Sequence, residues 1–224
     1  MSRKRPREVR LNDHLTHENY VRKTGELYDS IAEWYVQSFW NDETDSDWIK
    51  LCMSTLSGKR TILDIGSGPG NYARFFMEAS YDVTCMDISA EMMHKAMSRL
   101  PAVVGVVGDM RYVPFDNERF DCVLCAYSIN HIIEEDFQGT LHEFGRVLRP
   151  GGILCLMLKT GSISYEFSNS RNPKSRGVMC LFCSDAVIRA VRTIGVLPIQ
   201  VRYKDEASAS EFQHEKMLIV GSKL

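Results

Sequence analysis

The stretch ILDIGSGPG, from Ile62 to Gly70, decides how the rest of this chain is interpreted. It has the composition of a buried strand that ends in an acid, and Gly66, Gly68 and Gly70 follow at alternate positions. Glycines at a strand-to-helix turn let the backbone approach a ligand closely, and the helix that follows presents unpaired N–H groups. The stretch therefore predicts a ligand-binding turn at the carboxyl end of a strand.

The spacing of the glycines distinguishes this turn from one that binds a dinucleotide. A pyrophosphate-binding turn has the pattern G-x-G-x-x-G, whereas this chain has G-x-G-x-G with Asp64 inside the turn. A carboxylate there would repel a pyrophosphate and attract a cation, while the helix N-terminus can still serve an anionic group such as an amino-acid carboxylate. Both charges occur in one molecule, S-adenosylmethionine. A nicotinamide-dependent oxidoreductase would share the fold, but the spacing disfavours it.

Acidic residues also follow the next two predicted strands. Asp87 ends the strand in YDVTCMDIS, directly before Ile88, where an acid can accept the ribose hydroxyls of an adenosine. Asp109 follows the third strand and can accept the adenine amino group while Met110 packs on the ring. Taken singly, each acid could be an ordinary strand-end or turn residue. Together, they fall where an open α/β sheet binds its ligand.

The pattern from Thr61 onward predicts an α/β fold. Short apolar runs alternate with amphipathic segments, which indicates parallel strands with helices on both faces. The last two runs, VLPIQVRY and HEKMLIVGS, have no helix-sized segment between them, so we expect them to be antiparallel. Residues 161–179 are Gly/Ser/Asn-rich and are interpreted as a loop, and a helix is expected from Ser184 or Asp185 to Gly195.

Residues 1–57 are expected to form an N-terminal extension and helical cap, and residues 58–224 the main domain. The basic stretch 1–24 is interpreted as a solvated terminus in preference to a nucleic-acid-binding arm. Apolar residues at helical spacing predict a helix-loop-helix over 25–57, interrupted by the acidic residues 41–47.

Composition limits the class of protein without naming its chemistry. The 224 residues contain 27 Lys+Arg against 29 Asp+Glu, a net charge of −2, which excludes binding to polyanions through overall charge. No apolar run of membrane-spanning length and no signal-peptide pattern is present, so the expected location is cytoplasmic. The seven cysteines are expected to be reduced; the pairs Cys122/Cys125 and Cys180/Cys183 suit buried small hydrophobic residues better than a zinc site, and no metal is expected.

The ordered motifs ILDIGSGPG, MDIS, GDM, PFDNERFDCVLCAYSINHI and EFGRVLRPGG resemble class I S-adenosylmethionine-dependent methyltransferases. Within them, the chain is most similar to the small-molecule branch related to ubiquinone/menaquinone methyltransferases. The resemblance covers Tyr28 to Leu158, and the closing hairpin more weakly. It implies a Rossmann-like sheet of seven strands, mostly parallel with an antiparallel final strand, helices on both faces, an N-terminal helical cap, and S-adenosyl-L-methionine as cofactor.

The resemblance also implies which residues bind the cofactor. They are Tyr28, Tyr35, Asp64, Gly66, Ser67, Gly68, Gly70, Asp87, Ile88, Asp109, Met110, Ala126 and Tyr127. Ser67 stands where the family more usually has cysteine. His131, in AYSINHI, is the best candidate for a general base because histidine titrates near neutrality; ordering the loop or touching the cofactor is an equal alternative.

These observations favour an enzyme that transfers a methyl group to an O or N atom of a small-molecule acceptor by in-line displacement. The alternatives are a methyltransferase acting on tRNA or protein, and an inactive methyltransferase-like binding module. Acceptor choice is expected to come from the N-terminal helices and residues 161–179. We expect no membrane partner, no nucleic-acid partner, and a monomer or homodimer.

Overall fold

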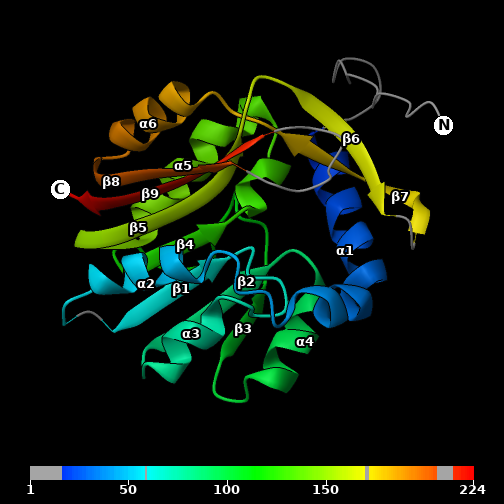
Figure 1. Ribbon diagram of the computed structural model, residues 1–224, viewed down its shortest axis with the longest axis horizontal. Coiled ribbons are helices and arrows are strands. Elements are labelled where there is room, and N and C mark those ends of the chain that lie inside the picture. The colour runs from blue at the N-terminus through cyan, green and yellow to red at the C-terminus, as the bar shows by residue number, and fades with distance from the viewer. Residues whose placement is uncertain (1–16, 59, 170–171, 206–213) are drawn as a thin grey trace.

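A seven-stranded sheet forms the centre of the computed structural model, which describes residues 17–58, 60–169, 172–205 and 214–224 (Figure 1). The strand order is β3-β2-β1-β4-β5-β9-β8. The bounds are β1 Thr61–Ile65, β2 Asp82–Asp87, β3 Val104–Val107, β4 Phe120–Ala126, β5 Leu148–Thr160, β8 Val196–Asp205 and β9 Glu215–Lys223. β1 to β5 pair in parallel, whereas β9 is antiparallel to both β5 and β8. The predicted fold class, including the antiparallel final strand, is therefore confirmed.

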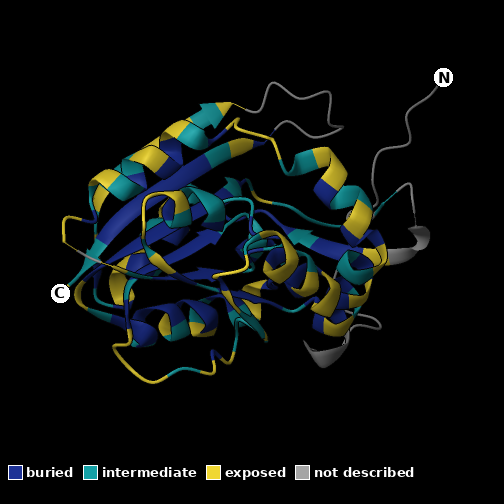
Figure 2. Ribbon diagram, turned by 90° about the horizontal axis from the view of Figure 1, so that it is seen from below, coloured by how far each residue is buried: buried dark blue, intermediate teal, exposed yellow. Residues whose placement is uncertain are grey.

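Helices cover both faces of the sheet, and each face has its own apolar core (Figures 1 and 2). Buried residues of α2, α3 and α4 pack on one face, and those of α5 and α6 pack on the other. Cys122 lies in the first core and Cys125 in the second, as the alternation of a strand requires. The bounds are α2 Ser46–Ser54, α3 Ala73–Glu78, α4 Ala90–Arg99, α5 Glu134–Val147 and α6 Ser184–Thr193, with a 3-10 turn, η1, over Ser128–His131.

The N-terminal helix α1 spans His17–Phe39 and begins earlier than expected. Part of the stretch interpreted as a solvated terminus is helical, and Tyr20, Val21 and Thr24 within it are buried. These positions lie at helical spacing before the buried Leu27, so they extend its apolar face, and the expectation was wrong from His17 onward. Residues 1–16, including most of the basic stretch, lie outside the described part of the chain.

The stretch interpreted as a loop, 161–179, is a β-hairpin instead. β6 (Ser164–Asn169) and β7 (Asn172–Cys180) pair antiparallel and form a separate two-stranded sheet. The hairpin lies beside α1 (Figure 1). A Cβ at Gly177 would lie 2.8 Å from the Phe167 ring and 3.0 Å from Leu27 of α1, so the glycine permits this close approach. The polar composition hid strands that form by packing against α1.

The burial of the cysteines differs from the expectation at one position. Six of the seven thiols are buried, but Cys183 is exposed, so its interpretation as a buried hydrophobic residue was wrong. Cys183 precedes α6 directly, where the chain leaves the apolar core.

Among the helices of the described ranges, none combines the length and apolar character that a membrane crossing requires.

Candidate active site

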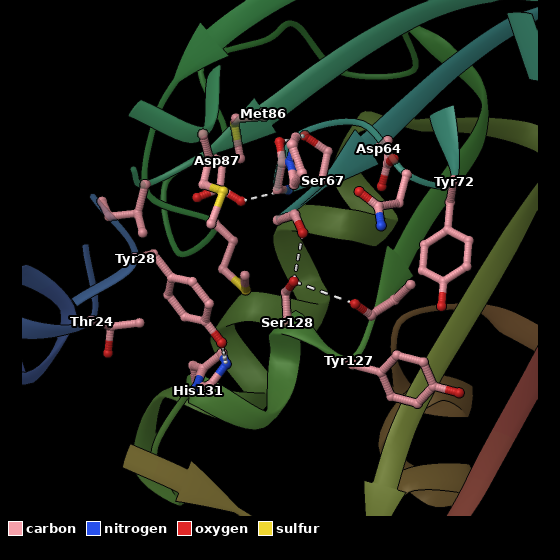
Figure 3. A pocket seen from close by; sticks show the side chains of 18 of the residues that line it. Thr24, Tyr28, Asp64, Ser67, Tyr72, Met86, Asp87, Tyr127, Ser128 and His131 are labelled. Atoms are coloured by element: carbon pink, nitrogen blue, oxygen red, sulfur yellow. Dashed lines mark hydrogen bonds between the residues drawn. The ribbon is translucent and has the colours of Figure 1, made fainter. Parts of the chain in front are cut away.

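A cavity of about 320 Å³ lies at the carboxyl ends of the parallel strands, with α1 along one side (Figure 3). Of the residues expected to bind a ligand, all but Gly70 line it, and so does His131. The contributing segments are far apart in sequence and meet because parallel strands end at one edge of the sheet. The cavity is of the size that small-molecule sites have in proteins, at the lower end of about 300–1,000 Å³.

The glycine turn is held against both β2 and η1. The N–H groups of Gly66 and Ser67 donate to the carbonyl of Met86, at 2.6 and 3.2 Å. The φ of Gly66 is +65°, and a Cβ added there would overlap the side chain of Ser128. The Ser128 hydroxyl in turn donates to the Gly66 carbonyl at 2.6 Å (Figure 3). Gly66 therefore allows two segments that line the cavity to touch.

Gly70 has a packing role rather than a lining one. Its φ is +88°, and an added Cβ would come within 2.7 Å of Leu100. The turn thus packs against the end of α4 at Gly70 instead of presenting this residue to the cavity. The helix after the turn, α3, begins only at Ala73 and has six residues.

Asp64 is a buried carboxyl group to which no described residue donates a hydrogen bond. It is the penultimate residue of β1 and is 1% exposed, and neither carboxylate oxygen has a hydrogen-bond partner within the described part of the chain. Burial, together with the charge of Asp87, raises the pKa of Asp64 to about 8. An isolated buried charge is costly, so this position favours a cationic ligand group that would stabilise the ionised form.

Asp87 is also buried, but it is hydrogen-bonded. Its Oδ2 accepts from the N–H of Gly68 at 2.8 Å, and its Oδ1 accepts from the N–H of Ser89 at 2.9 Å. Burial raises the pKa of Asp87 to about 6, against the opposing effect of these backbone hydrogen bonds. The carboxylate is thereby fixed with lone pairs left for neutral donors such as hydroxyl groups.

Asp109 differs from both, because its charge is already neutralised. Nε and Nη2 of Arg111 donate to its carboxylate at 2.7–3.2 Å, and the Arg111 backbone N–H donates to Oδ1 at 2.9 Å. A second cation has little to gain there, whereas a neutral N–H donor can still use a remaining lone pair. Asp64, Asp87 and Asp109, the three acids at the strand ends, therefore suit three kinds of ligand group.

His131 lies at the end of η1 with both ring nitrogens engaged. Nδ1 is 2.7 Å from the carbonyl of Val178, which can only accept, so Nδ1 carries the proton. Nε2 must then accept, and the hydroxyl of Tyr28 lies 2.8 Å from it (Figure 3). Burial and the nearby charge of Lys159 lower the pKa of His131, although the hydrogen bond to Val178 opposes this. The histidine is therefore a neutral acceptor at the cavity wall, with its Nε2 hydrogen-bonded to Tyr28.

A cluster of charged side chains at the cavity, formed by Asp45, Lys159 and Lys216, was not anticipated from the sequence. Asp45 is buried and accepts from the Tyr127 hydroxyl at 2.6 Å and from Lys216 at 3.2 Å. Lys159 and Lys216 face each other across β5 and β9, and both line the cavity. The φ of Tyr127 is +63°, an unusual backbone conformation for a side chain of this size. The register of β5 on β9 places Lys159 beside Lys216, and a sequence pattern does not contain this register.

Comparison with known proteins identifies the architecture. The family described as "Methyltransferase domain" matches residues 62–152. A glycine/sarcosine N-methyltransferase from Aphanothece halophytica is 35% identical over 158 residues, covering 67% of this chain and 57% of that protein. A malonyl-[acyl-carrier protein] O-methyltransferase from Pseudescherichia vulneris is 29% identical over 195 residues, covering 84% of this chain and 73% of that protein. The chain belongs to the class I methyltransferase family.

A solved structure agrees with this assignment at the level of the fold. The 1,6-didemethyltoxoflavin-N1-methyltransferase from Burkholderia thailandensis, with bound 1,6-didemethyltoxoflavin and S-adenosylhomocysteine, matches with a TM-score of 0.70 at 16% identity, over 97% of this chain and 93% of that one. Among the curated relatives, this methyltransferase-family chain spans only 57% of the length of the Aphanothece protein.

The chemistry of the cavity fits the methyltransferase cofactor S-adenosylmethionine. A cation would stabilise the ionised form of the buried Asp64, and the methionine part of the cofactor carries an ammonium group. Asp87 and Asp109 offer acceptors for the hydroxyl and amino donors of an adenosine. A pyrophosphate would instead lie beside two buried carboxylates.

Proposed function

We propose that this protein transfers the methyl group of S-adenosylmethionine to an O or N atom of a small-molecule acceptor. The observation that carries the proposal is Asp64: a buried carboxylate without a partner in the described structure, one residue from the glycine turn of a methyltransferase-family sheet. Burial keeps this group largely protonated in the free protein at neutral pH, so its ionised form gains most from a cationic group such as the ammonium of the cofactor.

In this proposal, successive strand ends hold successive parts of the cofactor. Asp64 pairs with the ammonium group, Asp87 accepts the ribose hydroxyls, and Asp109 accepts the adenine amino group. Further contacts to the cofactor come from the glycine turn, from the opposite wall and from α1; these residues are Gly66, Ser67, Gly68, Ile88, Met110, Ala126, Tyr127, Tyr28 and Tyr35. The cofactor supplies a methyl group on a sulfonium, which is an excellent leaving group.

The protein's main contribution is then to align the acceptor and exclude water. Positioning of this kind can lower a barrier by about 7–11 kcal/mol. α1 and Met179 of β7 both line the cavity, so the cap and the hairpin would enclose a small acceptor. The similar proteins are named for N-methylation of glycine or sarcosine and for O-methylation of malonyl-[acyl-carrier protein], so both acceptor atoms remain in the proposal.

An acceptor that must lose a proton would release it through Tyr28 and His131. Because Nε2 of His131 already accepts from the Tyr28 hydroxyl, the acceptor proton passes to the Tyr28 oxygen as the Tyr28 proton moves to Nε2. His131 thereby acts as the base, and Tyr28 relays the proton to it. The monomer or homodimer state and the two-part division at residue 57 stay predictions.

Incubation of the full chain with methyl-labelled S-adenosylmethionine and panels of small amines and carboxylic acids tests the proposal. We expect S-adenosylhomocysteine to form faster with members of one panel, and His131→Ala to slow that reaction. If S-adenosylhomocysteine binds and turnover occurs on bulk tRNA or protein but on neither panel, the acceptor is a macromolecule and not a small molecule. Binding without turnover on any of these would favour the inactive module.

A further inference from the structure

A network of four side chains joins the cap helix to the adenine end of the cavity. Arg111 holds the Asp109 carboxylate with Nε and Nη2, and its Nη1 donates to Oδ2 of Asp136 at 2.8 Å. The same Asp136 oxygen accepts from the Tyr20 hydroxyl at 2.9 Å. Tyr20 belongs to α1 and Asp136 to the first turn of α5, so the network connects three segments far apart in the chain.

The network is buried enough to be rigid. Tyr20 is 2% exposed, and the side chains of Arg111 and Asp136 are 11% and 21% exposed. The guanidinium of Arg111 lies 5.5 Å from the centre of the Tyr20 ring, which adds a cation–π contact. A planar guanidinium that is held on two sides has little rotational freedom, so it fixes the carboxylate it binds.

The position of Asp109 determines what the adenine end can recognise. Three N–H groups of Arg111 occupy most of the acceptor sites of the carboxylate, which leaves a remaining lone pair for a neutral donor. An adenine amino group is such a donor, whereas the carbonyl oxygen at the same position of hypoxanthine would face a lone pair.

We propose that Arg111 is the positioning residue that makes this site selective for adenine, and that Asp136 and Tyr20 make the selectivity depend on the docked cap helix. The inference rests on the proposed function only through the cofactor. It adds that the base is selected by an arginine that need not touch it, and that α1 contributes to this selection through the Tyr20 hydroxyl.

Binding calorimetry with S-adenosylhomocysteine and S-inosylhomocysteine tests the inference. The intact protein should prefer the adenine compound by about ten- to a hundredfold, the value of one hydrogen bond to a charged group. Arg111→Met should reduce that preference to about threefold or less, and Tyr20→Phe, which removes only a hydroxyl, should give an intermediate preference. A preference that is unchanged or larger in both variants overturns the inference.

Arg149→Met is the matched control. Arg149 pairs with Asp121 at 2.8 Å, but at the amino ends of the strands and outside the residues that line the cavity. This variant also loses an arginine–aspartate ion pair, although a more exposed one, and its preference for adenine should equal that of the intact protein. If Arg111→Met does not fold, Tyr20→Phe still decides. Failure of the intact protein to bind S-adenosylhomocysteine would instead refute the proposed function.

Discussion

The hydroxyl of Tyr28 on the cap helix lies 2.8 Å from Nε2 of His131 on η1. Val178 of the hairpin accepts from the other ring nitrogen at 2.7 Å, which leaves Nε2 as the acceptor. The cap, the sheet edge and the hairpin therefore meet at one imidazole. Phe167 of β6 lies against the same ring, with centroids 5.6 Å apart.

Removing the Tyr28 hydroxyl should slow turnover more than it weakens cofactor binding. In Tyr28→Phe, the phenyl ring still lines the cavity, but Nε2 of His131 loses its connection to the acceptor. We expect kcat to fall by about 10²-fold, the low end for acid–base catalysis, and the Kd for S-adenosylhomocysteine to change little. Tyr203→Phe, at an exposed tyrosine of β8, is the control and should leave both unchanged. Equal losses in kcat and affinity would assign Tyr28 to binding alone.

The pH dependence of turnover should reflect the lowered pKa of His131. Burial keeps the imidazole neutral below its ordinary range near 6.5, so it can still accept a proton in mildly acidic solution. With S-adenosylmethionine saturating at every pH, the acid limb of kcat/KM for the acceptor is therefore expected below pH 6.5, and it should disappear in His131→Asn. A limb at or above pH 6.5 that survives this substitution would remove His131 from the reaction.

Asp64→Asn should have opposite effects on the stability of the free protein and on cofactor affinity. The pKa of Asp64 is about 8 in the folded chain against 3.8 for an ordinary aspartate. The folded state therefore retains a proton that the unfolded state releases, so the free energy of unfolding falls as pH rises from 4 to 8. Asparagine removes that slope and should raise Tm at pH 8. It should also raise the Kd for S-adenosylhomocysteine at least tenfold. A variant that melts lower at pH 8 and binds normally would contradict this account.

Affinity for the cofactor should itself depend on pH through the same group. An ammonium ligand favours ionised Asp64, so binding releases a proton near neutrality, and the Kd for S-adenosylhomocysteine should decrease from pH 6 to pH 7.5. Calorimetry in two buffers of different ionisation enthalpy measures the released proton. Asp64→Asn supplies the control, since its proton release should be smaller; an equal release in both proteins would place the titrating group elsewhere.

Gly66→Ala should damage the site through sterics alone. The residue has a positive φ, and an added methyl group would overlap the side chain of Ser128. The backbone conformation alone costs about 1–2 kcal/mol, so Tm and cofactor affinity should both fall. Gly139→Ala, on α5 where an added Cβ meets nothing within 4 Å, should be neutral or stabilising. Normal binding by Gly66→Ala would show that the turn can move away from Ser128.

The sequence predicted most of the sheet and much of the cavity, because both depend on local patterns. The apolar runs locate the strands, and Asp64, Asp87 and Asp109 each follow a run that periodicity identifies. The hairpin of β6 and β7 was missed because its strands form against α1 and have little apolar pattern of their own. The cluster of Asp45, Lys159 and Lys216 and the network around Arg111 depend on tertiary register, which no short stretch contains.

A thermal-shift titration with S-adenosylhomocysteine and NAD, added separately to the full chain, tests the central claim most directly. A ligand that binds only the folded state must raise Tm with concentration. The uncompensated Asp64 and the glycine spacing predict that S-adenosylhomocysteine raises Tm and that NAD does not. Stabilisation by NAD without stabilisation by S-adenosylhomocysteine would contradict the assignment of this cavity to a methyl donor.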